Sequence, residues 1–186
     1  MRKNSTLYQQ ALEINIAIKL IRLGARLVVL TNELNISKEK LIMLYKEFNG
    51  GDSPVKGMLP SSIDWFVTWQ PCVHSSLFMS YYKFFEAKTN LSGVELLIKS
   101  YEMYLEEVSR HRNHDKENPV LSITRAWIML RMIKANHPLI VLTTCKICGG
   151  GFISRSEEKR NFYENYVCGF CNKPIRAGKT EKHAFV

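Results

Sequence analysis

The chain has 186 residues, of which 46% are hydrophobic and 23% are charged. This length suits one domain, or one domain with a small appendage, and the apolar fraction excludes a wholly disordered or collagen-like chain. No apolar run approaches the roughly 20 residues that cross a bilayer, and the basic N-terminus lacks the apolar core of a signal peptide. We therefore expect a folded cytoplasmic protein with no membrane contact.

Basic charge gathers at the two ends of the chain, whose formal net charge is +9. Residues 1–50 hold eight Lys and Arg against four Asp and Glu, and residues 145–186 also hold eight against four. The stretch between them holds ten against nine. This distribution favours a polyanionic partner held at two places, although basic charge alone also serves solubility.

Helical periodicity dominates the chain up to about residue 137. Apolar residues recur there at intervals of three and four, which predicts a mainly α-helical body over residues 1–137. The predicted helices cover residues 7–23, 25–34, 37–48, 61–69, 75–88, 94–108 and 119–135.

Several signals predict where these helices begin and end. Residues 61–64 and 92–95 have the Ser-x-x-acidic spacing of a capping box. Pro71 is expected to end or kink the helix before it, and Asn118-Pro119 is expected to start the last helix. Ten aromatic residues lie between Trp65 and Tyr104. They form either core or, in part, a surface for a protein partner.

Residues 27–46 fit the helix-turn-helix template. Asn35 stands where the turn favours a left-handed residue, Ile36 fills the corner and Ser37 caps the second helix. The residues predicted to pack inward are Leu30, Leu34, Leu41 and Leu44, and those predicted to face DNA are Lys38, Lys40, Met43 and Lys46. The alternative is that two short helices of a helical domain mimic this pattern without binding DNA.

The character of the sequence changes after Pro138. Residues 139–143 are short, apolar and partly β-branched, which predicts a strand, and glycines and cysteine pairs follow. We therefore expect a second module over residues 138–186. Its basic residues Lys173, Arg176 and Lys179 are a second set of candidate DNA contacts.

Four of the five cysteines form two pairs with the spacing C-x2-C-x19-C-x2-C, namely Cys145, Cys148, Cys168 and Cys171. Each pair can form a tight knuckle, and a hairpin between the pairs can bring the knuckles together as a closed zinc-ribbon-like site for one structural Zn²⁺. Two disulfides fit a cytosolic protein poorly, and the glycines beside the knuckles favour zinc over an iron–sulfur cluster. A zinc deaminase would need an H-x-E motif, and the sequence has none.

Cys72 and His74 are the remaining candidates for catalytic residues. A Cys/His catalytic pair needs a third partner, which is not evident, so Cys72 is better interpreted as a small buried residue. We expect no enzymatic activity.

With these residues in view, the chain resembles the FlhC family, one subunit of a bacterial flagellar master regulator. The Lys-Gly-Met-Leu-Pro and Asp-Trp-Phe segments are the specific features of the resemblance. The matching segments are residues 23–27, 44–47, 56–60, 64–69, 121–127 and 145–150. The resemblance implies a cytoplasmic activator that binds zinc through the four paired cysteines.

The resemblance also implies partners. Members assemble with FlhD as four FlhD and two FlhC chains, bind double-stranded promoter DNA of flagellar operons and recruit σ70 RNA polymerase. The alternative function is a zinc-stabilised RNA-binding protein, whose mark would be exposed stacking aromatics such as Phe162, Tyr163 and Tyr166.

Overall fold

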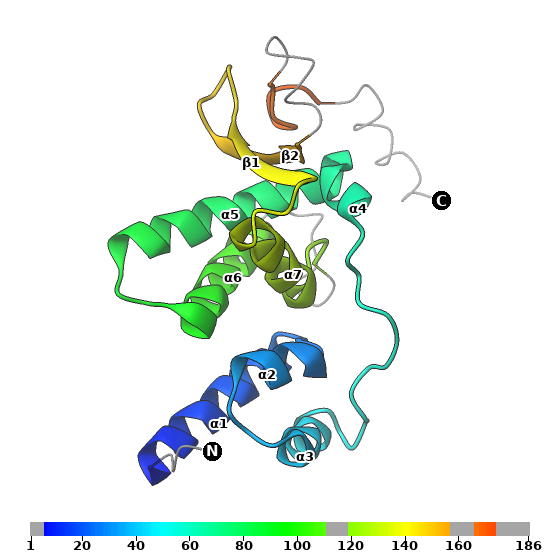
Figure 1. Cartoon of the computed structure of the whole chain (residues 1–186), viewed down its shortest axis with the longest axis vertical. Coiled ribbons are helices and arrows are strands. Elements are labelled where there is room, and N and C mark those ends of the chain that lie inside the picture. Colours follow the sequence, from blue (N-terminus) through cyan, green and yellow to red (C-terminus); the bar gives the residue numbers. More distant parts are fainter. Residues whose placement is uncertain (1–5, 111–118, 157–165, 174–186) are drawn as a thin grey trace.

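The computed structural model describes residues 6–110, 119–156 and 166–173, and within them the chain is mainly helical (Figure 1). The elements are α1 (Leu7–Arg22), α2 (Leu27–Glu33), α3 (Lys38–Phe48), α4 (Ile63–Val67), α5 (Trp69–Lys88), α6 (Gly93–Ser109), α7 (Ile123–Lys134), β1 (Ile140–Thr144) and β2 (Gly151–Arg155). The expected fold class is confirmed, a helical body with a small β element beside the cysteines.

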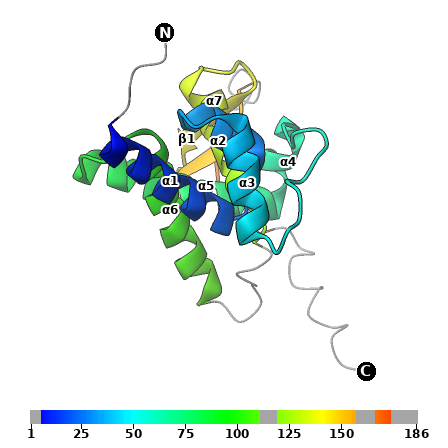
Figure 2. The same cartoon turned by 90° about the horizontal axis from the view of Figure 1, so that it is seen from below.

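The helices form two groups joined by the long connection over residues 49–62 (Figure 1). One group holds α1 to α3 and the other holds α4 to α7, and α2 lies against α7 in the view from below (Figure 2). Trp127 Nε1 of α7 donates a hydrogen bond of 2.7 Å to Glu33 Oε1 of α2, and the Arg26 N–H donates one of 3.0 Å to Thr124 Oγ1. One hydrophobic core runs through both groups.

Aromatic residues of α4, α5 and α6 fill much of this core. Phe66, Phe78, Tyr82, Tyr101 and Tyr104 are buried, which accounts for half of the ten aromatics between residues 65 and 104. Trp69 and Phe84 are exposed, at 36% and 57% of their surface. Trp65, Tyr81 and Phe85 are partly buried and pack against the same core, so core packing explains eight of the ten aromatics.

The two strands form an antiparallel pair that packs on α5. Leu142 lies opposite Ile153 in the register, and Ile140 and Ile153 join the main hydrophobic core. The predicted strand over residues 139–143 is confirmed with a shift of one residue. The module boundary near residue 138 stays a prediction.

The two predicted capping boxes do not form as hydrogen-bonded pairs. Ser62, not Ser61, occupies the N-cap of α4, and its side chain makes no capping hydrogen bond. Ser92 is the N-cap of α6 as expected, again without a side-chain bond. Sequence spacing identified the second helix start, but it did not predict the side-chain geometry that a capping box requires.

Pro71 neither ends a helix nor kinks one. α4 ends at Val67, Thr68 is extended, and α5 then begins at Trp69, so Pro71 lies in the first turn of a new helix. The prediction was wrong because the first-turn N–H groups have no partner within the helix, so a proline there loses no hydrogen bond.

The last helix also starts later than expected. α7 begins at Ile123, where the Ser122 hydroxyl accepts a hydrogen bond from the Arg125 N–H, and Pro119 precedes it. A side chain that satisfies a first-turn N–H fixes the start better than proline does. Asn118 lies outside the described residues.

Candidate metal centre and nucleic-acid-binding elements

The first cysteine pair lies in the turn between β1 and β2. The Cys145 N–H donates to the Gly150 carbonyl at 2.9 Å and the Gly149 N–H donates to the Cys145 carbonyl at 2.9 Å, which closes the turn. Gly149 has φ +70°, a conformation that glycine adopts readily. The first pair therefore lies at the tip of the β1–β2 hairpin, and the expected hairpin between the two pairs stays a prediction, since residues 157–165 lie outside the described residues.

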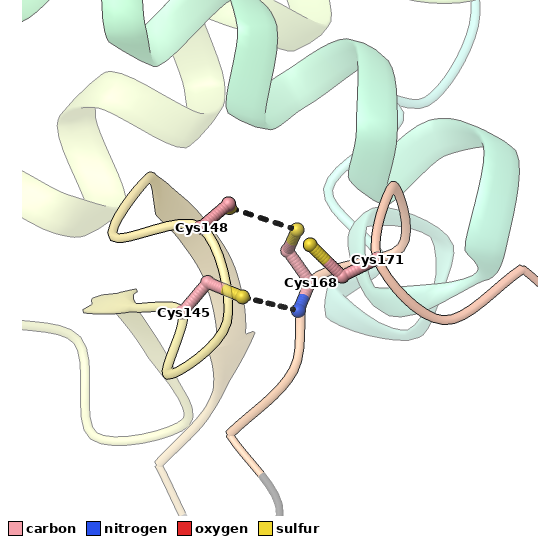
Figure 3. A group of neighbouring side chains, drawn as sticks. All are labelled: Cys145, Cys148, Cys168 and Cys171. Carbon is pink, nitrogen blue, oxygen red and sulfur yellow. Dashed lines mark hydrogen bonds between the residues drawn. The ribbon is translucent and has the colours of Figure 1, made fainter.

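The second pair forms a tight turn beside the first (Figure 3). The N–H groups of Cys171 and Asn172 both donate to the Cys168 carbonyl at 3.0 Å. Two bonds link the turns: the Cys168 N–H donates to Cys145 Sγ at 3.3 Å, and the Lys146 N–H donates to the Tyr166 carbonyl at 2.9 Å. The backbone itself therefore brings the four thiols together.

The four sulfur atoms form a compact cluster in which every Sγ lies within 4.8 Å of the others. Cys148 Sγ and Cys168 Sγ are 3.7 Å apart. A tetrahedral zinc ion with Zn–S bonds of about 2.3 Å places its sulfurs about 3.8 Å apart. The donor set and its spacing fit a closed tetrahedral site.

The thiols differ in acidity because their surroundings differ. Backbone N–H donors at Cys148 and Cys168 lower the pKa of Cys145 to about 6, whereas the neighbouring sulfur of Cys148 raises the pKa of Cys171 to about 12. Four thiolates this close repel one another, so a cation is needed to hold them all in the ionised form that binds metal.

The second knuckle packs against the first turns of α5. Trp69 Nε1 donates to the Gly169 carbonyl at 3.0 Å. A Cβ at Gly169 would lie 2.9 Å from Val73 Cγ2, so only glycine allows this approach. Arg155 of β2 forms an ion pair with Asp64 of α4. The sequence indicated the glycine but not these contacts, because their partners lie about 90 to 100 residues away.

Cys72 and His74 are both buried and point to different partners. The Cys72 thiol donates to the Ile153 carbonyl at 3.2 Å. His74 Nδ1 lies 2.8 Å from the Tyr104 hydroxyl. The two side chains therefore connect β2 and α6 to α5, as structural residues do.

The predicted helix-turn-helix corresponds to α2, the turn over residues 34–37, and α3. Ser37 caps α3 by accepting from the Lys40 N–H at 3.5 Å, and Ile36 is half-buried at the corner. Asn35 does not adopt the left-handed conformation that was predicted, and its Nδ2 instead donates to Glu13 Oε1 of α1. A third helix thus holds the turn in place of local backbone geometry.

The burial pattern of α3 follows the prediction. The inward leucines are buried or half-buried, and the predicted outward residues are exposed: Lys38, Lys40, Met43 and Lys46. Glu39 and Glu47 are exposed on the same helix, which reduces the positive potential of that surface.

The other candidate nucleic-acid contacts lie mostly beyond the described residues. Lys173 is exposed, whereas Arg176 and Lys179 are outside the described part of the chain. Phe162 and Tyr163 are also outside it. Tyr166 is half-buried with its hydroxyl enclosed, and it packs beside the cysteine cluster. No described aromatic from this set therefore offers an open stacking face.

Among the described residues, no helix combines the length and apolar character that crossing a membrane requires. The fold and the site together define a class of protein: a helical protein with a helix-turn-helix-like unit and a four-cysteine candidate metal centre.

Comparisons with known proteins identify the family. The model of the family described as flagellar transcriptional activator (FlhC) matches residues 1–184. A flagellar transcriptional regulator FlhC of Gallionella capsiferriformans is 48% identical over 96% of this chain and 93% of its own length. Those of Thauera aminoaromatica and Serratia marcescens are 41% and 40% identical, over 97% and 98% of this chain and 87% and 89% of their own lengths.

The chain belongs to the FlhC family of flagellar transcriptional activators. The resemblance drawn from the sequence is confirmed, and the family is one of transcriptional regulators and not of enzymes.

Proposed function

We propose that this chain is the DNA-binding subunit of a cytoplasmic activator that assembles with FlhD, as four FlhD chains and two of its own. The complex binds duplex promoters of flagellar operons and recruits σ70 RNA polymerase. The observation that carries the proposal is the family match over residues 1–184. The basic excess at the chain ends, +4 in residues 1–50 and +4 in residues 145–186, supports a polyanionic ligand.

The metal of the proposal is one structural Zn²⁺, bound by Cys145, Cys148, Cys168 and Cys171. A four-sulfur set with sulfurs within 4.8 Å supports it, since such sets favour zinc. When bound, the ion supplies a crosslink and the charge that four thiolates require. The protein's own groups orient the sulfurs, above all the Cys168 N–H that donates to Cys145 Sγ.

Two surfaces are proposed to contact DNA. One is the exposed side of α3, with Lys38, Lys40, Met43 and Lys46, and the other is the basic segment with Lys173, Arg176 and Lys179. Lysines serve mainly as phosphate contacts, so these residues position the complex more than they read bases.

The test is a binding titration on a duplex flagellar promoter fragment and on a shuffled duplex of the same composition. We expect FlhD to tighten binding to the promoter, with a preference over the shuffled duplex of about 10³-fold or more and a steep fall with salt.

A single-stranded RNA competitor and the chain without FlhD complete that experiment. Binding that ignores both the DNA sequence and FlhD would contradict the activator proposal. Stronger competition by the RNA than by the shuffled duplex would favour the RNA-binding alternative.

A further inference from the structure

Arg26 and Arg125 form a pair of neighbouring arginines at the junction of the two helix groups. Arg26 is the N-cap of α2, and its backbone N–H donates to the side chain of Thr124, the residue before Arg125. Both arginines are half-buried. The backbone contact fixes the two positions relative to each other, although they are about 100 residues apart in the chain.

Each guanidinium is held in place by a group that does not neutralise it. The Arg125 Cζ lies 3.8 Å from the centroid of the Trp65 ring, so the guanidinium rests on the indole. Arg26 Nη1 donates a bond of 2.8 Å to the Met58 carbonyl in the connection that rises to α4 (Figure 1). A guanidinium has five N–H donors, so both arginines keep donors for a ligand.

Positive charge at this junction is uncompensated within the described part of the chain. No described carboxylate forms an ion pair with either arginine, and the first turns of α2 and α7 contain no acidic residue. Arg125 lies in the first turn of α7, where the helix dipole disfavours a cation. Burial lowers the pKa of Arg125, and the charge of Arg26 lowers it further.

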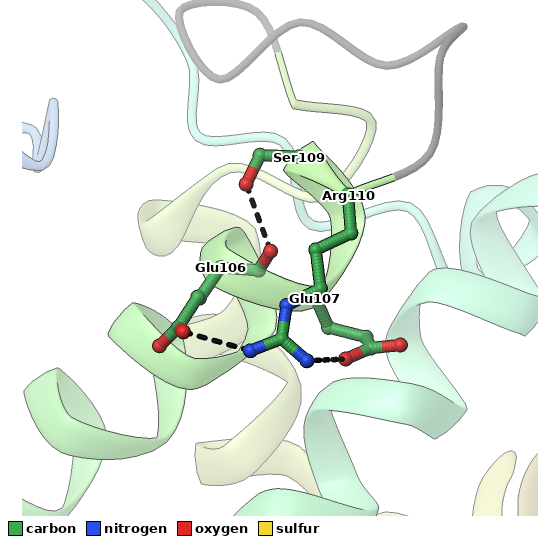
Figure 4. A network of polar contacts seen from close by, with 4 residues as sticks. All are labelled: Glu106, Glu107, Ser109 and Arg110. Carbon is green, nitrogen blue, oxygen red and sulfur yellow. Dashed lines mark hydrogen bonds and ion pairs between the residues drawn. The ribbon is translucent and has the colours of Figure 1, made fainter.

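Arg110 is an arginine of this chain whose charge is neutralised, and it serves as the comparison. Arg110 at the end of α6 is bonded to Glu106 at 2.9 Å and lies 3.5 Å from Glu107 (Figure 4). Two carboxylates there compensate one guanidinium, whereas at the α2–α7 junction two guanidinium groups share none from the described residues.

We propose that Arg26 and Arg125 together grip a backbone phosphate of the duplex DNA that the complex binds. A planar guanidinium offers two parallel N–H donors to phosphate oxygens, and stacking on Trp65 holds that plane still before the ligand arrives. The inference rests on the proposed function, because the phosphate belongs to promoter DNA.

The position of the pair supports DNA over a free anion. Trp65, on which Arg125 rests, is adjacent to Asp64, which pairs with Arg155 at the end of β2 that lies away from the cysteine turn. On its other side the pair begins the helix-turn-helix-like unit. The pair thus lies on a chain of contacts that runs from the helix-turn-helix-like unit to the β1–β2 hairpin, as a contact with an extended ligand beside that unit would require.

The experiment uses the complex with FlhD and measures the dissociation constant for duplex promoter DNA over a range of salt concentrations. The variant is Arg26→Gln with Arg125→Gln. Each neutralised phosphate contributes roughly 0.9 to the slope of log K against log salt, so losing the one phosphate that the pair grips should make the slope shallower by about 0.9. Binding to the shuffled duplex should weaken by a similar factor, since a phosphate contact carries no sequence information.

Two further variants separate charge from folding. Lys83→Gln with Arg110→Gln removes the same two charges where Glu86, Glu106 and Glu107 neutralise them, and the slope should not change. Arg26→Lys with Arg125→Lys should restore most of the slope, because it restores the charge. Circular dichroism and assembly with FlhD check that each variant folds.

An unchanged slope in a folded Gln double variant would overturn the inference while the proposed function stands. A second outcome would also overturn the inference. If both the Gln and the Lys variants fail to assemble with FlhD, and DNA binding falls only as much as assembly does, the pair belongs to a protein interface. Failure of the wild-type complex to bind the promoter would count against the proposed function itself.

Discussion

Gly169 is a residue at which the candidate metal centre packs closely against the helical body. A Cβ built there would lie 2.9 Å from Val73 Cγ2 and 3.1 Å from Trp69 Cδ1. Gly169→Ala should therefore push the second knuckle away from α5 and destabilise the protein by about 1–3 kcal/mol. Competition with a zinc chelator should show weaker metal binding, because Cys168 and Cys171 flank the displaced residue.

The control is Ile147→Ala in the first knuckle. Ile147 is 68% exposed, so its truncation should change metal affinity and stability little. Equal metal affinity in the Gly169→Ala variant and the wild type would mean that metal binding by the second knuckle does not depend on its packing against α5.

Single residues of the site were predictable only where the signal is local. The spacing of four cysteines predicted that they would meet, because two knuckles and one metal leave few other arrangements. The packing of the site against α5 was not predictable, since the hydrogen bond from Trp69 to Gly169 joins residues 100 positions apart. Asn35 was predicted as a left-handed turn residue, but its partner Glu13 comes from another helix.

At the scale of the elements, two serines that look alike in sequence have different roles. Ser122 accepts a hydrogen bond from the Arg125 N–H, whereas Ser92 makes no side-chain capping bond. Ser122→Ala should therefore lower the free energy of unfolding by about 1 kcal/mol, and Ser92→Ala by only a few tenths. Urea unfolding with zinc present measures both, and equal losses would contradict the assignment of the caps.

The same scale explains where helix prediction succeeded. Apolar periodicity placed α1, α3 and α6 within about two residues, because each presents a continuous apolar side to one core. It misplaced the helix boundaries around Pro71 and Pro119, where the ends depend on Thr68 and Ser122. Proline restricts the chain in a helix interior, but in a first turn it marks neither an end nor a start by itself.

At the scale of the molecule, the hydrophobic residues form two clusters of very different size. The large cluster spans the helices and includes Ile140 and Ile153 of the sheet. Among the described residues, the small one consists of Cys72, Phe152 and two of the paired cysteines, with Tyr166, Val167 and Cys171 partly buried against it. The helical body therefore has its own core, whereas the knuckles depend mainly on the cysteine cluster for their cohesion.

This division predicts the result of removing the metal. With chelator, the helical circular dichroism signal should fall only slightly, while amides of residues 145–155 and 166–173 should exchange hydrogen faster because the knuckles lose their crosslink. Amides of α6 serve as the internal control and should stay protected, and added Zn²⁺ should reverse the change. A cooperative loss of helical signal would instead mean that the helical body folds only around the metal. The structural route to that result is β2, which packs on α5, so that a loosened sheet exposes the large core as well.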